Sequence, residues 1–156
     1  MGKRIVVSGG AGYIGSHVCV ELLNSGHKAL VIDNFANSSP KALERIAEIA
    51  GEGVSLLKAD LADPADAARI IDAVRAYKPH GAIHLAGLKA VGESVADPVR
   101  YYSINLPATF TLVRALEEAD ARTIVFSSSA TVYGDRNASL VAENGSVGPT
   151  IPYGRT

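Results

Sequence analysis

Three glycines near the N-terminus are spaced to let a phosphate group approach the backbone. In the segment SGGAGYIGSH, Gly9, Gly12 and Gly15 form a G-x-x-G-x-x-G pattern, and Gly10 can replace the first of them in G-x-G-x-x-G. Such glycines permit a tight turn from a strand into a helix, whose first N–H groups attract an anion. The same glycines would also suit an ordinary strand-to-helix turn, so the motif alone is weak.

Asp33 supplies the second half of a dinucleotide-binding pattern. It ends the next apolar run, KALVID, at the spacing of about 20 residues where an acidic side chain can bind an adenine ribose. A carboxylate there repels a 2′-phosphate, and Asn34 rather than an arginine follows it. The pattern predicts NAD rather than NADP; the alternative is that Asp33 is a plain turn residue.

Short apolar runs alternate with stretches of helical periodicity along the chain. The runs predict strands at residues 4–8, 28–33, 54–58, 81–85 and 123–127. Continuous apolar strands separated by helices are typical of a parallel sheet covered on both faces. We therefore expect an α/β fold, a Rossmann-like doubly wound parallel sheet of about five strands in the order 3-2-1-4-5.

The helical stretches carry apolar residues at intervals of three and four, which predicts the side that faces the sheet. The expected inward residues are Ile14, Val18, Leu22, Leu43, Ile46, Ile49, Ala67, Ile70, Ile71, Val74, Leu112, Val113 and Leu116. The last three belong to a helix expected from about residue 98 to 119, which Pro107 should kink or divide. After Ser129 a long polar loop is expected to be functional or mobile, before a helix that begins near Tyr153.

Composition restricts the class of protein. The chain has 156 residues, enough for one domain, with 47% hydrophobic and 20% charged residues and a formal net charge of -1. It has no basic excess to attract nucleic acid or an anionic membrane, and no apolar run of about 18 residues. The single Cys19 fits a reducing compartment, and the N-terminal apolar run is too short for a signal peptide. We expect a cytoplasmic protein without a nucleic-acid or membrane partner.

Longer motifs narrow the function. The segments GGAGYIGSH, DNFANSS, HLAGLKAVGES, FSSSATVYGD and PYGR occur in this order and together span nearly the whole chain. In this combination the sequence resembles the UDP-glucose 4-epimerases, which are extended short-chain dehydrogenases/reductases. AGLKAVGES and SSSATVYG are much more specific than the glycine pattern. The resemblance implies tightly held NAD, interconversion of UDP-glucose and UDP-galactose, and a homodimer.

The resemblance also implies roles for individual residues. Ser129 and Tyr153 match the catalytic serine and tyrosine of the family, and the lysine of its Y-x-x-x-K motif would be residue 157. The implied cofactor-binding residues are Gly9, Gly12, Tyr13, Ile14, Gly15, Asp33, Asn34, Asn37, Ser38, Asp60, Leu61, Leu85, Ala86, Gly87, Lys89, Asn105, Ser129 and Tyr153. No metal site is implied, and His17 and Cys19 stand at i,i+2, where helical side chains diverge.

The implied reaction explains why these residue types are needed. Oxidation of a sugar C4 alcohol requires a base for the hydroxyl proton while hydride moves to the nicotinamide. An ordinary tyrosine has a pKa near 10 and is only about 0.1% ionised at pH 7. Lowering that pKa by about three units requires roughly 4 kcal/mol of phenolate stabilisation, from a nearby ammonium and the positive nicotinamide. The 4-keto sugar then turns over and receives hydride on its other face.

Simpler roles remain open for several of these residues. Ser129 could cap the loop that follows it, Tyr153 could be a packing residue, and Lys89 could be a solvated loop lysine. His84, in an apolar strand, is expected to be a hydrogen-bonded structural histidine.

Two further comparisons with the family bear on the function. Nucleotide-sugar dehydratases tend to carry an acidic residue where this chain has Ala130 and Thr131, which favours an epimerase over a dehydratase or reductase. Ile104 replaces a family asparagine, so one polar cofactor contact is expected to be missing. We expect residues 1–156 to be an NAD-binding domain that lacks the C-terminal UDP-sugar-binding domain and has no turnover alone; the alternative is a stand-alone NAD-binding module.

Overall fold

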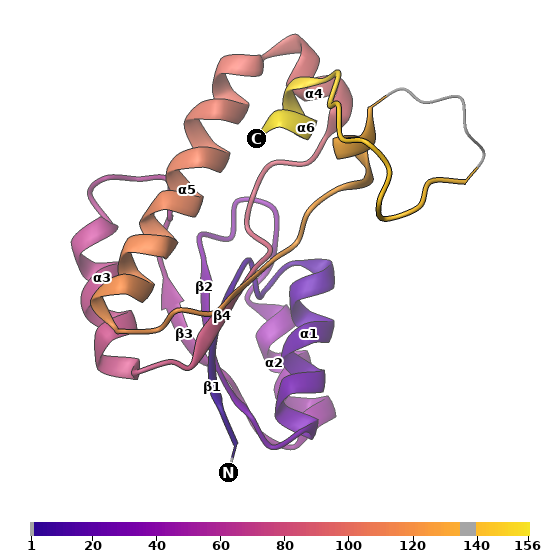
Figure 1. The fold of residues 1–156 in the computed structure, drawn as a ribbon. Helices are drawn as coiled ribbons and strands as arrows, with labels where there is room; N and C mark the ends of the chain where they lie inside the picture. The colour runs from indigo at the N-terminus through magenta and orange to yellow at the C-terminus, as the bar shows by residue number, and fades with distance from the viewer. Residues whose placement is uncertain (1, 135–139) are drawn as a thin grey trace.

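Strands and helices alternate along the chain in the computed structural model, which describes residues 2–134 and 140–156 (Figure 1). The described elements are β1 (Arg4–Ser8), α1 (Tyr13–Asn24), β2 (Lys28–Asp33), α2 (Lys41–Ala50), β3 (Ser55–Lys58), α3 (Ala67–Tyr77), β4 (Gly81–His84), α4 (Val91–Ala96), α5 (Pro98–Glu118), β5 (Ile124–Phe126), η1 (Ala130–Tyr133) and α6 (Pro152–Arg155). Every predicted strand forms within one residue of its expected bounds. The short helices α4 and η1 were not predicted. Part of the predicted polar loop, residues 135–139, lies outside the described residues.

The strands pair in parallel in the order β3-β2-β1-β4-β5. This is the predicted order, and it confirms the Rossmann-like fold. The register places Ser8, the last residue of β1, beside Ile32 of β2 and His84 of β4. The chain runs outward from β1 to β3 and then returns to β4 on the other side of β1. The strand order therefore reverses between β1 and β4.

Helices cover both faces of the sheet, and each side encloses its own hydrophobic core (Figure 1). Val6 of β1 belongs to the core that includes residues of α3 and α5, whereas Val7 belongs to the core that includes residues of α1 and α2. Both valines are completely buried. Successive residues of a strand point to opposite faces, so a strand with a core on each side has no polar alternation.

The two edge strands, β3 and β5, are exceptions to this two-sided cover. Three of the four residues of β3 are exposed, among them Leu56 at 43%. Ile124 is 39% exposed, Val125 57% and Phe126 50%. In the described part of the chain β5 pairs with β4 alone. The prediction of cover on both faces is therefore wrong for these two edge strands.

The inward faces of several helices differ from the predicted ones. In α1, Ile14 is 53% exposed, and the buried residues are Gly15, Cys19 and Leu23. Ile49 of α2 is 68% exposed and Val113 of α5 is 37% exposed, although both were expected to face inward. The buried face of α1 is rotated by one residue relative to the predicted face. Gly15 packs against the glycine turn, and Ile14 lines a cavity.

α5 is a single helix through Pro107, so of the two predicted outcomes, a kink or a division, the division is wrong. Tyr101 on one side of the proline and Leu112 on the other are completely buried. Burial of each side chain contributes about 2 kcal/mol, and together these outweigh the roughly 3 kcal/mol that an interior proline costs. At the N-terminus of α5, the side chain of Asp97 accepts a hydrogen bond from the Arg100 N–H.

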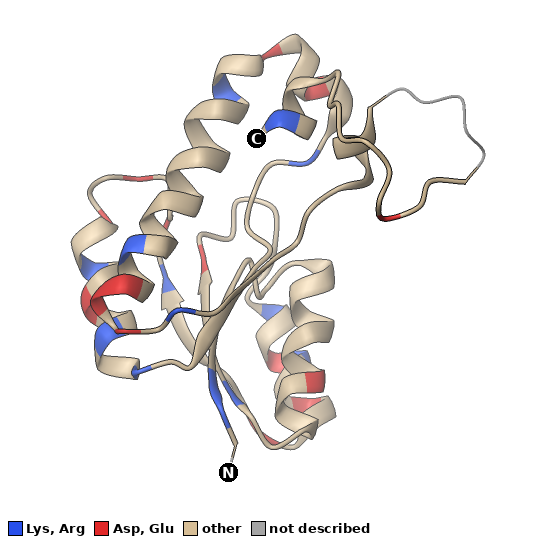
Figure 2. Ribbon diagram, in the orientation of Figure 1, with Lys and Arg blue, Asp and Glu red and all other residues tan. Residues whose placement is uncertain are grey.

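Charged residues of both signs are interspersed along the helices (Figure 2). Arg69 of α3 pairs with Asp66, the N-cap residue of this helix, and Arg75 pairs with Asp72, each at 2.6 Å. In residues 2–134 and 140–156, no helix has both the length and the apolar character needed to cross a bilayer.

Candidate functional site

Two adjoining cavities lie over the carboxyl ends of the strands. One has a volume of about 330 Å³ and the other of about 290 Å³. Both are lined by Gly9, Gly12, Tyr13 and residues 85–89, so they form one continuous groove, called the cleft below. The cleft crosses the sheet where the strand order reverses between β1 and β4. Doubly wound sheets bind their ligands at this position.

The glycine turn forms the centre of the cleft. Gly9 has φ +70°, and a Cβ atom on it would lie 2.8 Å from the Ala86 nitrogen. A Cβ on Gly15 would lie 2.1 Å from the Gly9 oxygen, so α1 packs against the turn with no room for a side chain. Gly12 is the N-cap residue of α1 and, as a glycine, has no side chain that could accept a hydrogen bond. The N–H groups of the first turn of α1 therefore have no side-chain acceptor at the cap, which suits an anion.

Asp33 fixes the shape of this turn. It is only 8% exposed, and its carboxylate accepts hydrogen bonds from the Ala11 N–H at 3.0 Å, the Phe35 N–H at 2.9 Å and the Ser38 hydroxyl at 2.8 Å. A carboxylate has about four lone-pair sites, so one acceptor position remains for a ligand. Asp33 is therefore both a structural turn residue and a lining residue of the cleft.

Asn34 and Asp60 both line the smaller cavity. The Asn34 amide donates to Asp60 Oδ2 at 2.9 Å, which links the ends of β2 and β3. Asp60 Oδ1 accepts from the Ala62 N–H at 2.8 Å. Both side chains are held by the protein itself, at the end of the cleft where the adenosine was predicted to bind.

Ser129 and Tyr153 line the larger cavity. Ser129 is the N-cap of η1, and its Oγ accepts hydrogen bonds from the Thr131 N–H at 3.2 Å and the Thr131 hydroxyl at 3.0 Å. The capping role considered for this serine is therefore real, but it uses only the acceptor sites of the oxygen. Tyr153 is half-buried on α6, and its ring packs edge-on against Tyr101 at 6.4 Å between centroids.

A buried chain of hydrogen bonds connects β1, β4 and α5 beneath the cleft. The imidazole of His84 lies 2.5 Å from Ser8 Oγ at Nδ1 and 3.0 Å from Thr109 Oγ1 at Nε2. The Thr109 hydroxyl donates to the Asn105 carbonyl, and Ser8 Oγ accepts from the Leu85 N–H at 3.3 Å. These directions require the tautomer with the proton on Nε2, which donates to Thr109 while Nδ1 accepts from Ser8.

Burial lowers the pKa of His84 to about 4, so the ring is neutral at pH 7. The prediction of a hydrogen-bonded structural histidine is thus confirmed. His84 also lines the larger cavity, which was not predicted. Its position at the end of β4 could have revealed this, because the carboxyl ends of adjacent parallel strands meet at one edge of the sheet.

The structure gathers all the predicted site residues in this cleft. The larger cavity is lined by Gly9, Gly12, Tyr13, Ile14, Gly15, Leu85, Ala86, Gly87, Lys89, Asn105, Ser129 and Tyr153, and the smaller one by Asp33, Asn34, Asn37, Ser38, Asp60 and Leu61. Their roles stay predictions. Ile104 lines the smaller cavity and presents an apolar side chain there, whereas Thr109 and Phe126 line the larger one without having been predicted.

Cys19 and His17 do not contribute to the cleft. Cys19 is a free, fully buried cysteine, and burial raises its pKa to about 12. Its thiol is therefore protonated at pH 7. Among the described residues, His, Cys, Asp and Glu form no group of three that could hold a metal ion.

Comparison with known proteins identifies the family. The model of the NAD dependent epimerase/dehydratase family matches residues 5–156. This chain belongs to that family. NAD, the predicted cofactor, is therefore confirmed at the level of the family.

Among the relatives of this family member is the UDP-glucose 4-epimerase of Bacillus subtilis (strain 168). It is 52% identical over 153 residues, which are 97% of this chain and 44% of that protein. The UDP-glucose 4-epimerase of Haemophilus influenzae is 47% identical over 151 residues, which are 96% of this chain and 44% of that protein. The chain therefore spans less than half the length of these relatives.

Solved structures of similar proteins share the fold. The UDP-glucose 4-epimerase of Bifidobacterium longum in complex with NAD+ and UDP superposes with a TM-score of 0.92, at 42% identity over 97% of this chain and 45% of that one. The enzyme from Stenotrophomonas maltophila with bound NAD and formylated UDP-arabinopyranose gives 0.91, at 39% identity over 98% of this chain and 45% of that one. The predicted resemblance is confirmed.

Proposed function

We propose that this chain is the NAD-binding part of a UDP-glucose 4-epimerase and that residues 1–156 alone do not turn over UDP-sugars. The continuity of the cleft carries the proposal, because it joins the glycine turn to the groove that holds Ser129 and Tyr153. A dinucleotide bound at the turn would extend along the same groove toward these hydroxyl groups. The relatives add support, since they carry the UDP-glucose 4-epimerase name and are more than twice as long as this chain.

The described residues fit NAD. Gly9 and Gly15 let the turn pack closely against Ala86 and against its own backbone, and the start of α1 offers N–H groups to a pyrophosphate. Asp33 retains one acceptor position for a ribose hydroxyl, and its negative charge opposes a 2′-phosphate. The glycine turn suits the pyrophosphate of either cofactor, and Asp33 favours NAD over NADP.

Bound NAD+ would supply the hydride acceptor for the C4 position of the hexose. Tyr153 would accept the C4 hydroxyl proton, and Ser129 would donate a hydrogen bond to the same oxygen. Ser129 Oγ accepts two hydrogen bonds from Thr131, which leaves its own proton for the substrate. Its capping role and its catalytic role are therefore compatible, because they use different parts of one hydroxyl.

The residues after Ser129 support an epimerase over a dehydratase. η1 begins with Ala130 and Thr131, and neither can act as the acid that elimination requires. Epimerisation through a 4-keto intermediate requires no such group, because the hydride returns to C4 and the proton returns to the oxygen on C4.

Further proposals concern the assembly and the compartment. Val99, Tyr102 and Phe110 of α5 are 72%, 38% and 61% exposed, an apolar stripe that supports the homodimer implied by the family. Light scattering coupled to size-exclusion chromatography should give twice the monomer mass of 16.2 kDa, and a monomer at micromolar concentration would contradict the dimer.

The free, buried Cys19 is compatible with the reducing conditions of a cytoplasmic protein.

Calorimetric titration of purified residues 1–156 with NAD+ and NADP+ tests the NAD-binding part of the proposal. NAD+ should bind and NADP+ should bind at least about tenfold more weakly, owing to charge repulsion at Asp33. The same protein should not convert UDP-galactose. No heat with NAD+ would contradict the cofactor assignment, and turnover would contradict the need for a further domain.

A chimera tests the epimerase assignment itself. This chain would replace the matching part of the Bacillus subtilis enzyme, to which it is 52% identical over 153 residues. A chimera that binds NAD+ should interconvert UDP-glucose and UDP-galactose, and Tyr153→Phe should lower its kcat by about a hundredfold or more. A folded, NAD-binding chimera without turnover would refute the assignment.

A further inference from the structure

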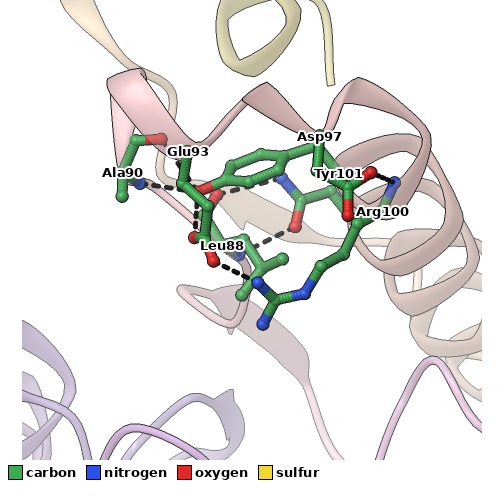
Figure 3. A network of polar contacts seen from close by, with 7 residues as sticks. Leu88, Ala90, Glu93, Asp97, Arg100 and Tyr101 are labelled. Atoms are coloured by element: carbon green, nitrogen blue, oxygen red, sulfur yellow. Dashed lines mark hydrogen bonds and ion pairs between the residues drawn. The ribbon is translucent and has the colours of Figure 1, made fainter. Parts of the chain in front are cut away.

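Two side chains of α5 hold the backbone that leaves β4. Asn105 Oδ1 accepts from the Leu88 N–H at 2.8 Å, and its Nδ2 donates to the Leu88 carbonyl at 3.0 Å. Two residues further along the segment, the Tyr101 hydroxyl accepts from the Ala90 N–H at 3.0 Å and donates to the Ala90 carbonyl at 2.9 Å. Figure 3 shows Tyr101 directed at Ala90 and Glu93. Each side chain thus binds both backbone groups of one residue, as a neighbouring strand would.

The two clamping side chains are almost completely shielded from water. Tyr101 is 0% exposed and Asn105 is 7% exposed. The Tyr101 proton is shared with Glu93 Oε2 at 2.8 Å, and Glu93 also forms an ion pair with Arg100 (Figure 3). A buried hydroxyl that loses its partners is costly, so this network keeps Tyr101 in one orientation.

Lys89 lies between the two clamped residues. In an extended segment alternate residues present their backbone groups to the same side, and Ala90 has the extended dihedral angles φ -79° and ψ 110°. Leu88 and Ala90 both face α5, so the residue between them faces away from α5. Lys89 does line both cavities of the cleft.

The same two side chains also contact the segment that carries Tyr153. The ring of Tyr101 packs against the ring of Tyr153, and Asn105 Nδ2 donates to Thr156 Oγ1 at 3.0 Å. One face of α5 therefore touches both walls of the larger cavity, the Lys89 wall and the Tyr153 wall.

We propose that Tyr101 and Asn105 are positioning residues that hold Lys89 at the wall of the cleft by clamping the backbone of Leu88 and Ala90. Asn105 then contributes to cofactor binding indirectly, because its carboxamide is occupied by Leu88 and Thr156. The consequence for the cofactor rests on the proposed function; the clamp itself does not.

Amide hydrogen exchange of the free protein tests the clamp without any ligand. In Tyr101→Phe the Ala90 N–H loses its acceptor and should exchange at least about tenfold faster, while the Leu88 N–H, held by Asn105, should keep its protection. Tyr102→Phe is the matched control on the next position of α5, where the tyrosine is 38% exposed and lines neither cavity. An unchanged Ala90 amide in Tyr101→Phe would overturn the proposal.

A double-mutant cycle tests whether Tyr101 acts through Lys89. Tyr101→Phe and Lys89→Met should each weaken NAD+ binding by about fivefold to tenfold, and the double variant should bind no more weakly than Lys89→Met alone. Additive losses would show that Tyr101 does not act through Lys89 and would overturn this part of the proposal.

Failure of the clamp and failure of the proposed function have different signatures. If the wild-type chain gives no heat with NAD+, the proposed function is contradicted, and the exchange of Ala90 still decides for or against the clamp. If NAD+ binds and Tyr101→Phe changes neither the exchange nor the affinity, the clamp is refuted while the proposed function stands.

Discussion

His84 should control how the stability of this domain falls in mild acid. Burial lowers its pKa from the ordinary value of 6.5 to about 4. Below pH 6.5 the unfolded chain binds a proton at this residue, whereas the folded protein does not until about pH 4. The stability contributed by neutral His84 is therefore fully present above pH 6.5 and is lost as the pH falls from 6.5 to 4. At about 1.36 kcal/mol per pKa unit the complete loss is about 3 kcal/mol, and about 2 kcal/mol is lost between pH 7.5 and pH 5.

Urea unfolding of the wild type and of His84→Gln at several pH values between 5 and 7.5 measures this effect. The variant should be less stable at pH 7.5, because Ser8 and Thr109 lose their partner, but it should lack the additional fall of about 2 kcal/mol toward pH 5. His80→Gln removes an exposed histidine and serves as the control. The reasoning is refuted if His84→Gln keeps the pH dependence of the wild type, or if the His84 ring titrates near pH 6.5 by NMR.

Three further substitutions test separate features, each by urea unfolding. Tyr77 has a buried hydroxyl without a hydrogen-bond partner among the described residues, so Tyr77→Phe should stabilise the protein by about 1 kcal/mol, and a loss would disprove this. Gly15→Ala places a Cβ 2.1 Å from the Gly9 oxygen, so it should lower the free energy of unfolding by about 3 kcal/mol or more and abolish NAD+ binding. In the control Gly92→Ala the added Cβ meets nothing within 4 Å, so this variant should be neutral or stabilising. Equal effects of the two substitutions would contradict the packing argument. Asp33→Ala removes the acceptor of three buried or half-buried donors, so it should lower the free energy of unfolding by about 2–3 kcal/mol. It should also reduce NAD+ affinity without creating NADP+ affinity. Calorimetry that shows a clean switch to NADP+ would contradict the structural role of Asp33.

The sheet could be predicted from the sequence because its strands interact with their neighbours in a regular way. Each apolar run begins at or directly after a glycine or a charged residue, and parallel order follows from the helices between the runs. The helix faces were harder to predict. Ile14 and Ile49 have the spacing of inward residues, but one lines the cleft and the other is 68% exposed on α2. Periodicity predicts which residues share a side of a helix, and it does not say what that side meets.

The candidate site could be predicted where a residue type has one strong physical requirement. Gly9 needs a positive φ angle and Gly15 needs the absence of a Cβ, so both were found from spacing alone. Ser129 was ambiguous, because a serine at a strand end can cap a helix or serve a substrate. The structure explains the ambiguity, since Ser129 caps η1 and lines the cleft at once.

The polar residues of α5 show most clearly what the sequence could not reveal. Tyr101, Asn105 and Thr109 recur every four residues and therefore lie on one side of the helix. On its own such a polar stripe indicates a solvated face. In the structure it is buried or half-buried. Tyr101 and Asn105 hydrogen-bond the backbone of Ala90 and Leu88, in the segment that leaves β4, and Thr109 hydrogen-bonds the side chain of His84, the last residue of β4. Tyr101 and Asn105 thus satisfy backbone groups of Ala90 and Leu88 that pair with no strand among the described residues, and a buried peptide group without a partner would cost about 1–3 kcal/mol. The cleft can therefore have an irregular wall at the end of β4 because α5 supplies, with side chains, the hydrogen bonds that a sheet would supply with backbone.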